Sequence, residues 1–130
     1  MTTVLLDTHA LVWAAGAPER LGTAAAALLR DPTTDVLVSA ASAWEVATKV
    51  RLGRFPEAEI LVAQFDSTVR TLGARPLPIS AAHALRAGSL RWDHRDPFDR
   101  MLAAQALLEH ATLLTVDPAF GALGGLAIAW

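Results

Sequence analysis

The sequence of 130 residues contains no cysteine, a single lysine and no apolar run long enough to cross a membrane. Without cysteine, a disulfide framework and a zinc site built on thiolates are both excluded. The longest uncharged stretch, residues 118–130, is shorter than the ~18 residues of a membrane helix and contains three glycines and a proline. The N-terminus lacks a secretory pattern because Asp7 and His9 interrupt its apolar segment. We therefore expect a cytoplasmic protein that does not enter a membrane.

Hydrophobic residues make up 53% of the chain, and the excess is mostly alanine and leucine, which favour helices. This length and composition suffice for one buried core, so we expect a single domain over residues 1–130. The net charge of −2 neither favours nor excludes nucleic acid as a partner. All basic residues except Lys49 are arginine. The arginine guanidinium suits phosphate well, although a GC-rich coding bias is the simpler cause of this ratio.

Short apolar runs alternate with helical patterns along the whole chain. Strands are expected at residues 3–6, 35–38, 75–79, 112–116 and 126–129. Helices are expected at residues 8–15, 24–30, 42–52, 56–72, 80–88 and 97–110. This alternation is typical of parallel strands with helices on both faces. The predicted fold is an α/β protein, a three-layer α/β/α sandwich around a short, mostly parallel central sheet.

Five acidic residues in four segments lie where predicted strands end or where helices begin. Asp7 follows the first strand, Glu45 lies in the first turn of the helix after the second, and Asp117 follows the fourth. Asp96 and Asp99 open the helix at residues 97–110. Ligand sites of open parallel sheets lie beyond the carboxyl ends of the strands. These acids are therefore expected at one edge of the sheet.

Most of these acids also have a simpler structural explanation as helix caps. Ser42 and Glu45 have the spacing of a capping box, and Asp96 and Asp117 each precede a proline, as N-cap residues often do. Asp7 fits this explanation least, because a carboxylate at the mouth of an apolar core is costly unless it is paired.

Convergence of the acids would favour a metal site over a set of independent caps. Two carboxylates 4 Å apart repel by roughly 4 kcal/mol at an effective dielectric constant near 20, so a cluster of four needs cations. Oxygen ligands without cysteine select Mg²⁺ or Mn²⁺. Such ions commonly serve phosphoryl chemistry. We therefore predict hydrolysis of a phosphodiester by water that the cation activates.

Five segments carry a pattern that covers nearly the whole chain: residues 5–11, 39–46, 49–54, 94–106 and 114–117. The block from Asp99 to Ala106, which includes Gln105, is the most specific of them. In order and spacing the pattern resembles the PIN domain, and in particular the VapC-type toxins of bacterial toxin–antitoxin pairs.

The resemblance implies a Mg²⁺- or Mn²⁺-dependent endoribonuclease toxin that a small cognate, VapB-like antitoxin inhibits by binding in a hydrophobic groove. It also implies a homodimer. The family's acidic quartet of catalytic and metal-binding residues falls on Asp7, Glu45, Asp99 and Asp117. Thr8 matches a hydroxyl residue that can orient Asp7 or a metal-bound water. Asp96 matches an additional acid found in one branch of the family. Thr8 and Asp96 are both expected to contact the metal ligands and not the metal itself.

Basic residues close to the acids are candidates for contact with RNA phosphates. They are Lys49, Arg51, Arg54 and Arg100. The first three also fit an ordinary solvated helix end, where cations interact well with the helix dipole. Arg100 could equally pair with a neighbouring acid.

Three other classes of protein are compatible with an α/β chain of this length. A two-component receiver domain needs a lysine after its fifth strand, whereas the only lysine here is Lys49. A haloacid-dehalogenase-type phosphatase needs a second aspartate two residues after the first, where this chain has His9. A non-catalytic binding module would tolerate loss of the acids, yet all four are present. The nuclease hypothesis fits the residues best.

Overall fold

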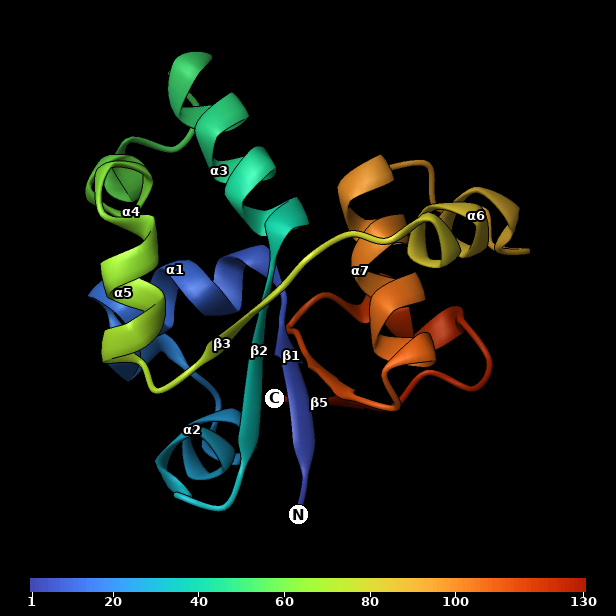
Figure 1. The fold of residues 1–130 in the computed structure, drawn as a ribbon, viewed down its shortest axis with the longest axis horizontal. Helices are drawn as coiled ribbons and strands as arrows, with labels where there is room; N and C mark the ends of the chain where they lie inside the picture. The colour runs from blue at the N-terminus through green and yellow to red at the C-terminus, as the bar shows by residue number, and fades with distance from the viewer.

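The computed structural model describes residues 1–130 and contains one five-stranded sheet (Figure 1). The strands are β1 (Thr3–Leu6), β2 (Asp35–Ser39), β3 (Arg75–Leu77), β4 (Thr112–Leu114) and β5 (Ile128–Ala129). Their order across the sheet is β3-β2-β1-β4-β5, and every pairing is parallel. The predicted α/β sandwich is confirmed, with a sheet that is parallel throughout.

Seven α-helices and three short 3₁₀ helices connect and cover the strands. The α-helices are α1 (Thr8–Gly16), α2 (Thr23–Arg30), α3 (Ala40–Arg51), α4 (Glu59–Ala63), α5 (Phe65–Thr71), α6 (Ala81–Ser89) and α7 (Pro97–Leu108). The 3₁₀ helices are η1 (Pro18–Arg20), η2 (Pro56–Ala58) and η3 (Pro118–Ala122). No helix combines the length and the apolar character that crossing a bilayer would require.

The single helix expected at residues 56–72 is wrong. The chain there forms η2, α4 and α5, and it breaks between the two α-helices at Gln64, whose φ of −127° and ψ of 35° are not helical. The break lets Leu61 and Val69 both reach the core. Packing against the sheet therefore overrides a helical pattern that looks continuous in the sequence.

Helices cover both faces of the sheet, so its strands are apolar on both sides. In β1, Val4 and Leu6 belong to a core cluster that includes residues of α1, α2, α3, α4 and α5. Leu5 points the other way, into a second cluster with Leu102 of α7 and Phe120 of η3. The alternation along one strand thus divides the interior into two cores, one for each outer layer.

Helices begin directly after strands at the carboxyl edge of the sheet, and this brings several helix N-termini together. Asp7 is the N-cap of α1, Ser39 that of α3 and Asp117 that of η3. In Figure 1, α3 continues beyond the carboxyl end of β2, whereas α7 begins near the same edge and runs back beside the sheet; α3 and α7 are in contact. This edge is where the sequence predicted a site.

The capping box expected from Ser42 and Glu45 is wrong. Helix α3 begins at Ala40, and Ser39 caps it by accepting a hydrogen bond of 2.9 Å from the Ala41 N–H. Ser42 and Glu45 therefore lie inside the helix, where both are buried. As a result the Glu45 carboxylate is free to contact other elements.

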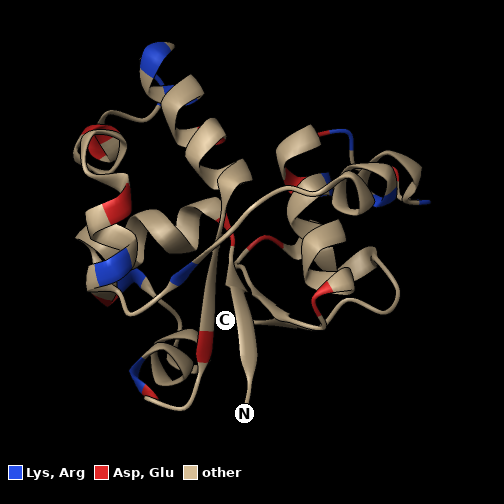
Figure 2. Ribbon diagram, viewed as in Figure 1, with Lys and Arg blue, Asp and Glu red and all other residues tan.

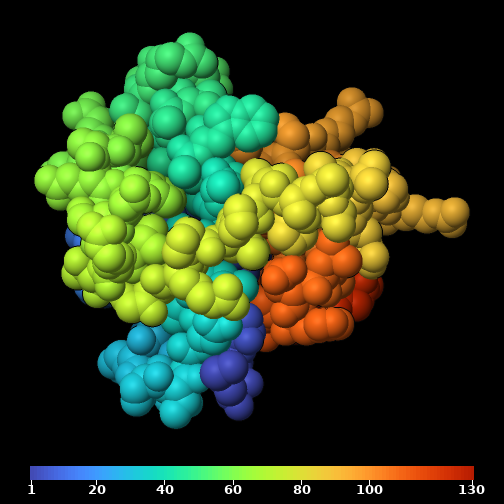
Figure 3. Space-filling model, viewed as in Figure 1, coloured from blue at the N-terminus to red at the C-terminus, as the bar shows by residue number.

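The segment that contains β3 and α6 crosses one face of the molecule. In Figure 3 it forms a continuous yellow band between the green atoms of α4 and α5 and the orange atoms of α7. Helix α6 packs closely on α7. This segment thereby supports, from outside, the helix that carries Asp99.

The C-terminal strand is held against the loop before α2. The Trp130 carbonyl accepts a hydrogen bond of 2.9 Å from the Ala24 N–H. The centroid of the Trp130 ring lies 5.6 Å from that of the Trp13 ring. Gly22 permits this approach, because a Cβ atom at this position would come within 2.4 Å of the Trp130 carbonyl carbon. The close contact is with backbone, which cannot move aside as a flexible side chain would.

We expect Gly22→Ala to lower the free energy of unfolding by about 1–3 kcal/mol, the usual cost of inserting atoms into a packed site. Gly88→Ala is the matched control, because Gly88 lies in α6 and a Cβ there would meet nothing within 4 Å. That variant should gain roughly 0.5–1 kcal/mol from helix propensity. Urea denaturation measures both changes, and equal effects would contradict the packing argument.

Candidate active site

A pocket of about 300 Å³ opens at the carboxyl edge of the sheet. Its lining residues come from the ends of β1 and β4, from α1, α3, α7 and η3, and from the loop before α7: Asp7, Thr8, His9, Glu45, Lys49, His94, Asp96, Asp99, Val116, Asp117 and Phe120. Figure 2 shows acidic segments of α3, α7 and the strand ends around this region. The four acids that the sequence singled out therefore line one pocket, together with Thr8 and Asp96.

Asp7 is buried at the end of β1, with 6% of its surface exposed. One carboxylate oxygen, Oδ1, accepts a hydrogen bond of 2.8 Å from the Ala10 N–H and so caps α1. Burial is the main cause that raises the pKa of Asp7, and the charge of Glu45 adds to it, while hydrogen bonds from Thr115 and Ala10 act in the opposite direction. The carboxylate thus combines a capping role with a place in the pocket.

Glu45 is held from both sides by neighbouring side chains. The Thr8 hydroxyl donates a hydrogen bond of 2.6 Å to Oε1, and the Lys49 ammonium pairs with Oε2. The Thr8 hydroxyl also lies 3.1 Å from that of Ser42. Thr8 was expected to orient Asp7 or a metal-bound water, but its carboxylate partner in the structure is Glu45.

Asp99 projects into the pocket from the first turn of α7. Its Oδ2 lies 2.7 Å from Nε2 of His94, and 18% of its side chain is exposed. Burial raises the pKa of Asp99 to about 6, with contributions from the charges of Asp96 and Glu45 and an opposing one from the His94 hydrogen bond. A carboxylate with such a pKa is poorly stabilised as an anion by its surroundings.

Asp96 and Asp117 both act as N-caps at the rim of the pocket. Asp96 Oδ1 accepts hydrogen bonds from the N–H groups of Phe98 at 2.8 Å and Asp99 at 3.4 Å. Asp117 Oδ1 accepts one of 2.9 Å from the Ala119 N–H. Each of these two caps therefore uses one of its carboxylate oxygens to bind backbone.

The donor set suits a divalent cation with oxygen ligands. Ligand atoms of His94, Asp96 and Asp99 all lie within 4.8 Å of one another. The pKa values of Asp7 and Asp99 are raised in part by neighbouring carboxylates, a cost that a bound cation would remove. The residues present thus fit a divalent cation.

The basic residues proposed from the sequence have different surroundings. Lys49 lines the pocket through its ion pair with Glu45, whereas Arg51 and Arg54 are exposed at and beyond the end of α3. Arg100 does not line the acidic pocket, and its guanidinium donates to the carbonyls of residues 87, 90, 92 and 94. The expectation that Arg100 contacts RNA stays a prediction.

Two residues outside the predicted set of site residues also contact the acids. His94 binds Asp99. The Thr115 hydroxyl accepts a hydrogen bond of 3.0 Å from the Asp117 N–H, and its hydrogen bond to the Asp7 carboxylate acts to lower the pKa of Asp7. A signal for Thr115 was present, since it lies directly after β4 and two residues before Asp117. His94 lies in an irregular loop, where no periodicity indicates the direction of a side chain.

The PIN domain family model matches residues 4–126. The chain is 32% identical over 120 residues to Ribonuclease VapC22 of Mycobacterium tuberculosis, and the alignment covers 90% of this chain and 88% of that protein. It is 39% identical over 57 residues to Ribonuclease VapC16 of the same organism, a match that spans 44% of this chain and only 40% of that relative.

Solved structures share the fold at lower sequence identity. VapBC2 from Rickettsia felis, bound to a DNA fragment from its promoter, superposes with a TM-score of 0.70 at 19% identity and covers 98% of each chain. FitAcB from Neisseria gonorrhoeae gives a TM-score of 0.63 at 22% identity, covering 96% of this chain and 95% of that one. At these identities the likeness shows the fold alone.

The raised pKa of Asp99 predicts how the stability of the metal-free protein depends on pH. Between the usual pKa of 3.8 and about 6, the folded state binds more protons at this residue than the unfolded state. The contribution of Asp99 to the free energy of unfolding therefore falls as pH rises through this window. Asp99→Asn removes that contribution. The free energy of unfolding of the variant, relative to that of the wild type, should therefore rise by roughly 1–3 kcal/mol between pH 4 and pH 7.

Urea denaturation in EDTA across this range measures the difference between the two proteins. Asp31→Asn is the control, because Asp31 is exposed and hydrogen bonds from Thr33 lower its pKa. Its substitution should produce a change of the opposite sign. A pH-independent difference for Asp99→Asn would contradict the raised pKa.

Proposed function

The chain belongs to the PIN-domain family, and on that basis we propose that it is a metal-dependent endoribonuclease of the VapC type, the toxin of a toxin–antitoxin pair. The observation that carries this proposal is the convergence of Asp7, Glu45, Asp99 and Asp117 on one pocket. Capping alone does not explain it, because Glu45 and Asp99 are not N-caps and still face the same space. The match to Ribonuclease VapC22 supports RNA as the substrate.

We assign the four acids to binding Mg²⁺ or Mn²⁺, with Asp7 and Asp99 as the principal ligands. When bound, such a cation would neutralise phosphate charge and make a water molecule a stronger nucleophile. Thr8 keeps the Glu45 carboxylate in place through its hydrogen bond of 2.6 Å. Lys49 brings a positive charge to the pocket wall, where it can pair with an RNA phosphate as well as with Glu45.

RNA approaching the pocket would pass the exposed end of α3. Basic segments lie at this outer end in Figure 2, and Arg51 and Arg54 belong to it. We propose that these two side chains attract the RNA backbone without selecting its sequence.

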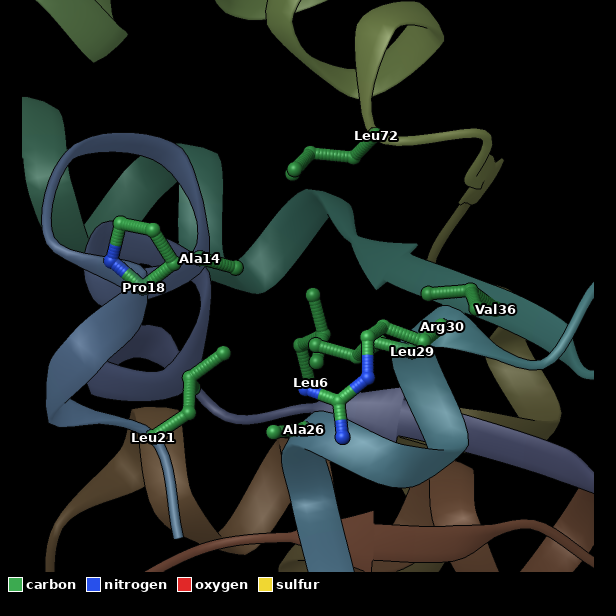
Figure 4. A pocket seen from close by; sticks show the side chains of 9 residues that line it. All are labelled: Leu6, Ala14, Pro18, Leu21, Ala26, Leu29, Arg30, Val36 and Leu72. Carbon is green, nitrogen blue, oxygen red and sulfur yellow. The ribbon is translucent and has the colours of Figure 1, made fainter. Parts of the chain in front are cut away.

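We further propose a small antitoxin as protein partner, as the resemblance implies. An apolar pocket of about 240 Å³ lies between α1, α2 and the end of α5, and none of its lining residues is acidic. The lining residues are Leu6, Ala14, Pro18, Leu21, Ala26, Leu29, Arg30, Val36 and Leu72. Figure 4 shows these side chains around it, with Arg30 as the one charged group. A pocket of this kind suits an apolar side chain of the partner, with an acidic group beside Arg30.

A homodimer is also proposed from the resemblance. Trp44 on α3 is 62% exposed, and it lines a second apolar pocket with Ile79 and Phe98. An exposed tryptophan beside other apolar side chains is typical of a protein interface.

The purified chain should cleave RNA with Mg²⁺ or Mn²⁺ and lose this activity in EDTA. Ca²⁺ should support cleavage poorly because its coordination geometry is looser. Gel analysis of a mixed RNA substrate measures the reaction, and Asp7→Asn prepared in parallel controls for a contaminating nuclease. Undiminished cleavage in excess EDTA would overturn the proposed mechanism.

Asp96 and Asp99 should differ in their importance for cleavage. Asp96→Ser keeps an N-cap for α7, and its rate should fall by no more than the ~10–100-fold typical of residues behind metal ligands. Asp99→Ser removes a proposed ligand and should abolish cleavage. If the two folded variants are equally inactive, Asp96 is itself a ligand and the assignment is wrong.

A further inference from the structure

We propose that His94 is a positioning residue for Asp99: it holds one oxygen of the carboxylate so that the other is presented to the cation. The inference rests on the proposed function, since it concerns the same metal site. Nε2 of His94 lies 2.7 Å from Oδ2 of Asp99, and both side chains line the acidic pocket. With Oδ2 bound by His94, Oδ1 is the oxygen of Asp99 that we assign to the cation.

The imidazole of His94 packs against the ring of Trp92, with the ring of Phe120 beside both. Its centroid lies 4.7 Å from the ring of Trp92 and 6.3 Å from that of Phe120, and these two rings are 5.5 Å apart. Phe120 is almost fully buried and belongs to the core cluster beneath α7. The direction of the imidazole is therefore set by packing and not only by Asp99.

Arg100 immobilises the backbone that carries His94. Its guanidinium donates hydrogen bonds of 2.7 Å to the Leu90 carbonyl, 2.8 Å to that of Trp92 and 3.0 Å to that of His94 itself. Arg100 follows Asp99 directly in α7, so adjacent residues of one helix bind the backbone and the side chain of His94. The loop is fixed relative to the carboxylate it contacts.

Such a device is useful because Asp99 lies among other negative groups. Burial raises the pKa of Asp99 and the charges of Asp96 and Glu45 add to this effect, so repulsion by these two carboxylates would favour turning Asp99 away from the site. Outer hydrogen bonds of this kind orient metal ligands, and their loss typically weakens metal binding by ~10–100-fold. We expect the same of His94.

Mn²⁺ binding to the full-length chain, measured by calorimetry without RNA, tests the proposal. His94→Ala should weaken binding by ~10–100-fold. His94→Gln should recover most of the affinity, because the glutamine amide places an N–H near the position of Nε2. The change in charge alone predicts that Mn²⁺ affinity is unchanged or higher in His94→Ala, since deleting a neutral or positive group does not reduce the net attraction of the site for a cation.

Arg95→Gln is the matched control, because Arg95 is an exposed neighbour in the same loop. It removes a positive charge and should leave Mn²⁺ affinity equal to or above that of the wild type. Circular dichroism of each variant checks that the fold is retained. A loss of affinity in Arg95→Gln equal to that of His94→Ala would mean that the loop responds to any substitution, which overturns a specific role for His94.

The remaining outcomes separate this inference from the proposed function. If the wild type does not bind Mn²⁺, the proposed metal dependence fails and this inference fails with it. If the wild type binds Mn²⁺ and His94→Ala binds equally well, only the inference fails. Electron spin-echo spectroscopy of bound Mn²⁺ provides the last distinction: nitrogen coupling that disappears in His94→Gln would make His94 a direct ligand and overturn the positioning role.

Discussion

Repulsion among buried carboxylates is the constraint on which the rest of this structure depends. Asp7 and Glu45 are almost fully buried at the same edge of the sheet, so burial raises the pKa of Asp7 and the charge of Glu45 adds to this effect. Such groups stay together only if the scaffold holds them more firmly than they repel. The parallel sheet does this, because its β1 and β2 ends are hydrogen-bonded neighbours whose apolar side chains fill two cores.

Capping and metal binding are not competing explanations for these acids. Asp7, Asp96 and Asp117 each give one oxygen to a backbone N–H at the start of a helix, and all three line the pocket. A carboxylate has two oxygens, so the cap fixes the side chain and leaves the second oxygen for another partner. The helix N-terminus also offsets part of the negative charge.

Much of the fold and the position of the site could be predicted from the sequence, because both depend on local patterns: apolar strands, helix stops, and acids directly after strands. What could not be predicted depends on contacts between distant segments. The break at Gln64 arises from packing on the sheet, and the Thr8–Glu45 hydrogen bond joins two helices. The His94–Asp99 contact depends on an irregular loop held by a side chain.

The different contacts of the Lys49 and Arg100 side chains show how helix geometry determines the net charge of the pocket. Both follow a proposed ligand closely in sequence, yet Lys49 lies one helical turn after Glu45 and pairs with it. Arg100 is adjacent to Asp99, and neighbouring residues of a helix point in different directions. Its charge is therefore directed to backbone carbonyls and does not neutralise the acids. The pocket thus retains more negative than positive charge, which is the condition under which a divalent cation binds.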